Sequence, residues 1–192
     1  MFETNRLLQA ALALSELLTA KGTPHAFHGS ILPAILAESP HSDEICCIVE
    51  GGQTQTHPFR RVRDALSGNE DWATTLSPWT NRLHVSYRRL IPPIDIEILP
   101  AGEAGPRHLD ASTVMQLQGI PFLTISEFLR ARLNSWMIRA GEREAHEISY
   151  VLTRFWNKVD VNRILEQDMN QFVSKNQAAA PAWTAVKRKY GM

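Results

Sequence analysis

Strict alternation of apolar and acidic residues over positions 94–99 (IDIEIL) is the feature that most constrains the fold. Side chains two residues apart in a β-strand point to the same face of the sheet. Asp95 and Glu97 therefore share one face, while the three isoleucines point to the other. The segment predicts a strand with one acidic and one apolar side.

Other segments predict a sheet and several helices around that strand. Residues 44–49 are apolar and rich in β-branched side chains, which favours a central strand. The remaining predicted strands are 24–28, 82–88, 114–118 and 121–124, with a hairpin around Pro92-Pro93 and the last two at sheet edges. The predicted helices are 5–21 with Thr4 as N-cap, 31–37, 58–66, 126–139, 143–159, 161–174 and 182–190. Residues 69–81 give no clear prediction.

This order of elements predicts the fold class. A mixed α/β (α+β) half precedes a half that is helical to the end. We therefore expect a mixed β-sheet flanked by helices, with residues 1–124 as the α/β core. Residues 125–192 are expected to form a C-terminal helical part that packs on this core as one compact unit.

Composition narrows the classes of partner and compartment. Twenty basic and twenty acidic side chains cancel over 192 residues, which makes non-specific binding of nucleic acid unlikely. No segment has the uninterrupted apolar length of a membrane span, so no membrane partner is expected. The two cysteines, Cys46 and Cys47, are adjacent and fit a reducing compartment. The sequence therefore predicts a soluble, intracellular, cytoplasmic protein of unknown oligomeric state.

A glycine-serine step joins the first short strand to the next helix. Gly29 and Ser30 separate residues 24–28 from residues 31–37, in the segment FHGSILPAIL. Backbone N–H groups at a helix N-terminus can hold a phosphate, although a purely structural turn is the alternative interpretation. His28 precedes the step and is a candidate for acid/base work or a phosphate contact; a strand-end histidine with an ordinary hydrogen bond is its alternative.

Three segments in this order resemble the nucleotidyltransferase superfamily, especially its small antitoxin and antibiotic-modifying forms. The segments are FHGSILPAIL, SDEICCIV and PPIDIEILPAG, and the stretches GIPFLTISEFLRARLNSWM and REAHEISYVL are similar to the following helical part. The resemblance implies a nucleotidyltransferase-like fold and a site for Mg²⁺ with a nucleoside triphosphate. It implies that Gly29 and Ser30 cradle the phosphates, that Glu44 and Asp95 bind metal, and that Glu97 is a spare acid.

The carboxylate set is incomplete for that family. The family has an acid-x-acid pair on the central strand, and two registers are open here. One places Glu44 and Cys46 on the pair, and the other places Asp43 and Ile45, so either register supplies a single acid. A thiol is a poor ligand for Mg²⁺, which prefers oxygen. The sequence therefore predicts a divergent member.

Three functions remain open. The first is transfer of a nucleoside monophosphate from a nucleoside triphosphate to a small molecule or a protein. The second is a non-catalytic relative that binds a small-molecule ligand or a partner. The third is a metal-independent acid/base enzyme that uses His28 with Asp95 or Glu97.

Other charged side chains have structural alternatives. Asp95 and Glu97 are alternatively an exposed strand face with Arg88 or Arg89 as cross-strand partners. Arg60 and Arg63 share a helix face and are candidates to grip an anionic substrate, with a solvated helix face as the alternative.

Overall fold

The computed structural model describes residues 2–192, which form two compact units, residues 2–123 and 124–192. The first unit contains one seven-stranded mixed sheet in the order β3-β4-β5-β2-β1-β7-β6. Its elements are α1 (Glu3–Ala20), β1 (His25–His28), α2 (Ile31–Leu36), β2 (Cys46–Val49), α3 (Pro58–Leu66), β3 (Trp72–Leu76), β4 (Leu83–Tyr87), β5 (Ile94–Pro100), β6 (Val114–Leu117) and β7 (Ile120–Leu123). The predicted α/β class with a mixed sheet is confirmed.

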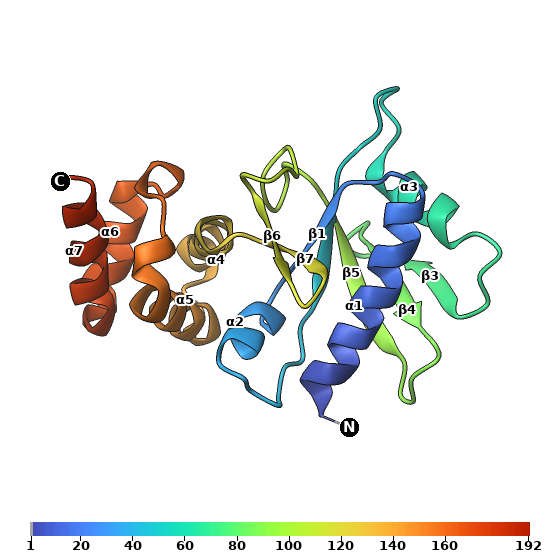
Figure 1. Cartoon of the computed structure of the whole chain (residues 1–192), viewed down its shortest axis with the longest axis horizontal. Helices are drawn as coiled ribbons and strands as arrows, with labels where there is room; N and C mark the ends of the chain where they lie inside the picture. Colours follow the sequence, from blue (N-terminus) through green and yellow to red (C-terminus); the bar gives the residue numbers. More distant parts are fainter. Residues whose placement is uncertain (1) are drawn as a thin grey trace. The chain divides into compact units, whose positions relative to one another are not determined.

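Two helices cover one face of this sheet. Helix α1 packs against β1, β5 and β7, and α3 packs against β2 and β5 (Figure 1). Cross-strand register places Phe27, Cys47 and Ile98 on this covered face, and all three are fully buried. Alternation then directs the polar side chains of β5 to the opposite face. The face predicted for Asp95 and Glu97 is therefore the one that α1 and α3 leave uncovered.

The loop after β5 covers one end of the sheet face that lies opposite α1 and α3. Ala26, Cys46, Ile48, Leu99 and Leu123 form a buried cluster there, against which Ala101, Ala104, Leu109 and Val114 pack. A Cβ atom on Gly105 would lie 2.6 Å from Ile48 Cδ1, so a larger residue there would require the Ile48 side chain to shift. The covered end is apolar, which leaves the polar end of this face for a site.

The second unit is helical. It contains α4 (Ile125–Arg139), α5 (Glu142–Phe155), α6 (Glu166–Lys175) and α7 (Ala180–Lys189), with 3-10 turns at Trp156–Lys158, Val161–Arg163 and Gln177–Ala179. The Thr124 hydroxyl accepts a hydrogen bond from the Glu127 N–H and caps α4. No helix within residues 2–192 has the length and apolar character that a bilayer crossing requires.

Several predicted boundaries were wrong. Helix α1 begins at Glu3, so Thr4 lies inside it and donates its hydroxyl proton to the Ser39 carbonyl at 2.8 Å instead of capping. The segment predicted as helix 143–159 ends in a 3-10 turn, Trp156–Lys158. The segment predicted as helix 161–174 begins with another, Val161–Arg163. Strand β7 lies between β1 and β6 and is no edge strand. The unassigned segment 69–81 contains the edge strand β3.

His25 lies on the covered face and is buried beneath α1. Its Nδ1–H donates to the Thr23 carbonyl at 2.8 Å, and its Nε2 accepts from the Ser15 hydroxyl at 2.7 Å. Burial lowers the pKa of His25 below its ordinary value, and the bond to Thr23 only partly opposes this. The neutral imidazole is therefore the form that the folded protein prefers.

We expect His25 to make the protein less stable in acid. Because its folded pKa lies below the unfolded one, the unfolded chain binds more protons. The stabilisation is complete above the unfolded pKa and is lost as the pH falls towards the folded pKa. The thermal midpoint should fall between about pH 7.5 and about pH 5.5, and less so in His25→Gln. The exposed control His146→Gln should keep the full decrease; an equal decrease in His25→Gln would contradict the assignment.

Candidate functional site

Four side chains from four adjacent strands form one row on the uncovered face of the sheet. His28 on β1 lies opposite Cys46 on β2, Cys46 lies opposite Glu97 on β5, and Glu97 lies opposite His84 on β4. Residues directly opposite each other across strands project to the same face. The register therefore brings together the predicted His28 and Glu97 with Cys46 between them, and adds His84.

This register shows which residues of the central strand lie on the same face as the row. Cys46 lies opposite Glu97, whereas Ile45 is buried and precedes the first paired residue of β2. Glu44, two residues before Cys46, is half-buried. Residues 44 and 46 therefore lie on the face of the sheet that carries the candidate site. The register also places Glu97, and not Asp95, directly beside the thiol, because Asp95 lies opposite Ser86 and is exposed.

Cys46 is a buried thiol with a hydrogen bond of its own. Its Sγ donates to the His28 carbonyl at 3.2 Å, and its side chain is 4% exposed. The neighbouring Cys47 faces the helices, and burial raises its pKa well above the ordinary value. Cys47 therefore favours the protonated form, and Cys46 makes its hydrogen bond as a thiol donor.

Glu97 is held by an arginine that the sequence prediction missed. Arg82 Nη1 donates to Glu97 Oε1 at 2.8 Å, and this bond and the carboxylate charge raise the pKa of Arg82 further. Arg89, one of the two partners in the alternative interpretation, pairs with Asp71 at 3.9 Å instead. The signal was present in the alternation of residues 82–88, which places Arg82, His84 and Ser86 on one polar face.

The glycine-serine turn binds the segment before β2. The Ile31 N–H donates to the Glu44 carbonyl at 3.1 Å. The Ser30 hydroxyl lies 3.2 Å from the Ser42 hydroxyl, 3.4 Å from Asp43 Oδ1 and 3.3 Å from the Glu44 carbonyl. These hydrogen bonds hold the turn after β1 against residues 42–44, which lead into β2. Phosphate binding by Gly29 and Ser30 stays a prediction.

The residues present do not fit a pair of magnesium ions. Mg²⁺ is held by carboxylate and other oxygen atoms, and here a protonated thiol stands beside an ion-paired Glu97. Among residues 2–192, no three His, Cys, Asp or Glu side chains are arranged so that they could hold a metal ion. The metal roles of Glu44 and Asp95 stay predictions from the resemblance.

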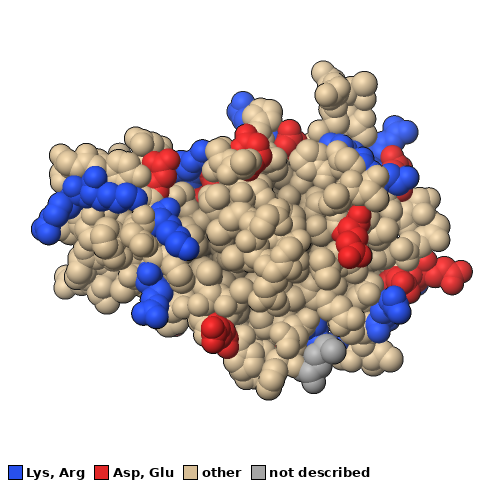
Figure 2. All heavy atoms as spheres, viewed as in Figure 1, with Lys and Arg blue, Asp and Glu red and all other residues tan. Residues whose placement is uncertain are grey.

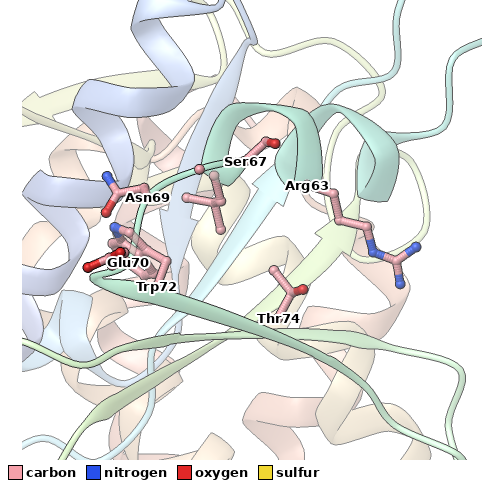
Figure 3. A pocket seen from close by; sticks show the side chains of 8 residues that line it. Arg63, Ser67, Asn69, Glu70, Trp72 and Thr74 are labelled. Atoms are coloured by element: carbon pink, nitrogen blue, oxygen red, sulfur yellow. The ribbon is translucent and has the colours of Figure 1, made fainter.

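A separate pocket of about 420 Å³ lies between the end of α3 and β3. Arg63 projects from α3 on one side, while Asn69 and Glu70 lie on the other (Figure 3). Arg60, predicted to act with Arg63, approaches Asp64 instead, at 4.0 Å. The pocket contains none of the row His28, Cys46, Glu97 and His84, so we keep it apart from the candidate site.

Comparisons with known proteins bear on the fold. No family model matches this chain, and no curated protein matches it in sequence. Among solved structures it is similar to an antigenic nucleotidyltransferase-like protein from Paracoccidioides brasiliensis, with 15% identity, a TM-score of 0.70, and coverage of 94% of this chain and 93% of the other. JHP933 from Helicobacter pylori is similar at 12% identity and a TM-score of 0.55, over 93% of this chain and 78% of the other. The chain therefore has a nucleotidyltransferase-like fold.

Proposed function

We propose that this protein is a ligand-binding relative of the nucleotidyltransferases that does not carry out metal-dependent nucleotidyl transfer. The observation that carries the proposal is Cys46. The resemblance assigns a second carboxylate to this position, and the protein has a buried thiol that donates to the His28 carbonyl. Removing one carboxylate from a site for two Mg²⁺ ions removes both charge and ligands that the ions need.

The charge of the site also disfavours a triphosphate. Glu44, Asp95 and Glu97 belong to the acidic side of the site, and Arg82 is the cation bonded to Glu97. Without metal ions, these carboxylates repel a polyphosphate. The row instead offers the half-buried His84 imidazole and Glu97 carboxylate for hydrogen bonds, beside the buried His28. We therefore propose that the ligand is a small polar molecule that is uncharged or cationic.

Acid/base catalysis by His28 with Glu97 has weaker support. The two residues lie on strands separated by β2, so their backbones are about 10 Å apart at the usual strand spacing. The Glu97 carboxylate is also bonded to Arg82 at 2.8 Å. A general base needs a direct hydrogen bond, or one water, to the proton that it accepts.

Thermal unfolding with candidate ligands tests this proposal. We expect no metal-dependent rise of the midpoint with any of the four nucleoside triphosphates, with or without Mg²⁺ or Mn²⁺. Uncharged nucleosides or polyamines should raise the midpoint, since a ligand at about a hundred times its dissociation constant stabilises by about 2.7 kcal/mol. Glu97→Gln should abolish that rise, and Glu16→Gln, at an exposed residue of α1 on the other side of the sheet, is the matched control.

The opposite outcome is equally specific. A metal-dependent rise with a nucleoside triphosphate that disappears in Glu44→Ala and in Asp95→Ala would overturn the proposal. It would instead support nucleotidyl transfer with Mg²⁺ at these two carboxylates.

A further inference from the structure

The charges of this protein are segregated between its two units. Residues 124–192 contain eleven Lys and Arg against seven Asp and Glu, whereas residues 1–123 contain nine against thirteen. The neutral total therefore conceals a basic helical unit. On the face drawn in Figure 2, several Lys and Arg side chains lie around the helices that carry the C-terminus in Figure 1, with a few acidic side chains near them. This excess positive charge is available to attract an anionic surface.

Two segments of the helical unit form a basic patch, which we call the C-terminal patch. They are residues 154–158 (RFWNK) and residues 187–192 (KRKYGM). Lys189 Nζ donates to the Asn157 carbonyl at 2.7 Å, and the Tyr190 hydroxyl donates to the Val159 carbonyl at 3.4 Å. The end of α7 thus lies against the 3-10 turn that follows α5.

The C-terminal patch contains five cations and no acid. Arg154, Lys158, Arg188 and Lys189 are exposed, and Lys187 is half-buried. Of the acids at its border, Glu166 lies 3.9 Å from Lys187 and offsets that one charge, while Asp160 lies 3.7 Å from Arg163, outside the patch. The patch therefore keeps a net positive charge.

Large apolar side chains are exposed within the same patch. Trp156 is 38% exposed, Tyr190 39% and Met192 58%. The Met192 N–H donates to the Lys187 carbonyl at 3.0 Å, so this residue folds back onto the last turn of α7. Exposed apolar groups among cations match the interfacial region of a bilayer, where Trp and Tyr sit at headgroup level and Lys extends towards the phosphates.

We propose that the C-terminal patch binds the surface of membranes that contain anionic lipids. Single-stranded nucleic acid is the other polyanion that cations and aromatic rings recognise, through stacking of bases on ring faces. Here Lys189 Nζ lies 5.2 Å from the centre of the Tyr190 ring and Lys158 Nζ lies 5.8 Å from that of Phe155, so an ammonium already occupies one face of each ring. Met192 has no ring to stack. Insertion into a lipid headgroup layer, unlike base stacking, does not require a free ring face.

Sedimentation of the full chain with vesicles tests this proposal. We expect binding to vesicles of phosphatidylcholine mixed with phosphatidylserine, little binding to phosphatidylcholine alone, and weakening by salt. The double variant Arg188→Glu/Lys189→Glu should bind at least about tenfold more weakly. Lys21→Glu/Arg107→Glu is the matched control, because it makes the same change of charge at exposed residues of the first unit.

A pair of tryptophan variants separates apolar insertion from charge alone. Trp156→Ala should weaken vesicle binding by roughly threefold or more, while Trp79→Ala, at a 93% exposed tryptophan of the first unit, should leave it unchanged. Circular dichroism confirms that each variant is folded. Equal binding to neutral and anionic vesicles, unchanged binding of the charge-reversal variant, or binding to labelled oligonucleotides in preference to vesicles would each overturn the proposal.

Discussion

Replacement of Gly29 by alanine is expected to destabilise the first unit by about 3 kcal/mol, which lowers the thermal midpoint by roughly 10 °C. Gly29 has a φ of +117°, and a Cβ atom there would lie 3.0 Å from the Glu44 carbonyl oxygen. That carbonyl cannot retreat freely, because it also accepts the Ile31 N–H at 3.1 Å. Alanine would therefore face both an unfavourable backbone conformation and a backbone clash.

A second glycine separates these two causes. Gly22 has a φ of +61°, and nothing lies within 4 Å of a Cβ atom built there. Gly22→Ala should cost about 1 kcal/mol, the price of the left-handed conformation alone. Urea titrations followed by circular dichroism measure both changes. Equal destabilisation of the two variants would show that the close approach of Gly29 to Glu44 contributes nothing.

Loss of the Glu147 carboxylate is expected to destabilise the helical unit by about 3–5 kcal/mol. Arg132 Nε lies 2.8 Å from Glu147 Oε2 in an ion pair, and the two side chains are only 6% and 8% exposed. Arg143 Nε lies 3.6 Å from the other carboxylate oxygen. Glu147→Ala leaves the Arg132 guanidinium buried without this carboxylate, and the cost of that buried charge is the main part of the effect.

Two further variants make this prediction specific. Glu142→Ala removes an exposed acid from the first turn of the same helix and should cost less than about 1 kcal/mol. Arg132→Met combined with Glu147→Leu removes both charges and should recover most of the lost stability. Urea unfolding monitored by circular dichroism reports each change. A cost for Glu147→Ala no larger than that for Glu142→Ala would refute the buried pair as a stabilising contact.

Local patterns in the sequence predicted the main elements correctly where one face is strongly apolar. Helix 58–66 was predicted at its observed bounds, and residues 94–99 lie within β5 with Ile96 and Ile98 buried on the helix-covered face. Edge strand β3 was missed because residues 74–76 are exposed and carry no alternation of burial. An edge strand is stabilised by its single neighbour, here β4, and not by its own pattern.

By itself, the sequence determined which side chains share a face: Asp95 with Glu97, and His25 opposite to His28. These relations follow from the two-residue period of a strand and need no knowledge of its neighbours. It also indicated that a carboxylate is missing near Cys46. Only the tertiary structure decided that Glu97 and not Asp95 lies beside Cys46, and that Arg82 holds Glu97. The register of β2 against β5 depends on packing between segments some fifty residues apart. No local sequence pattern specifies which residues of the two strands are paired.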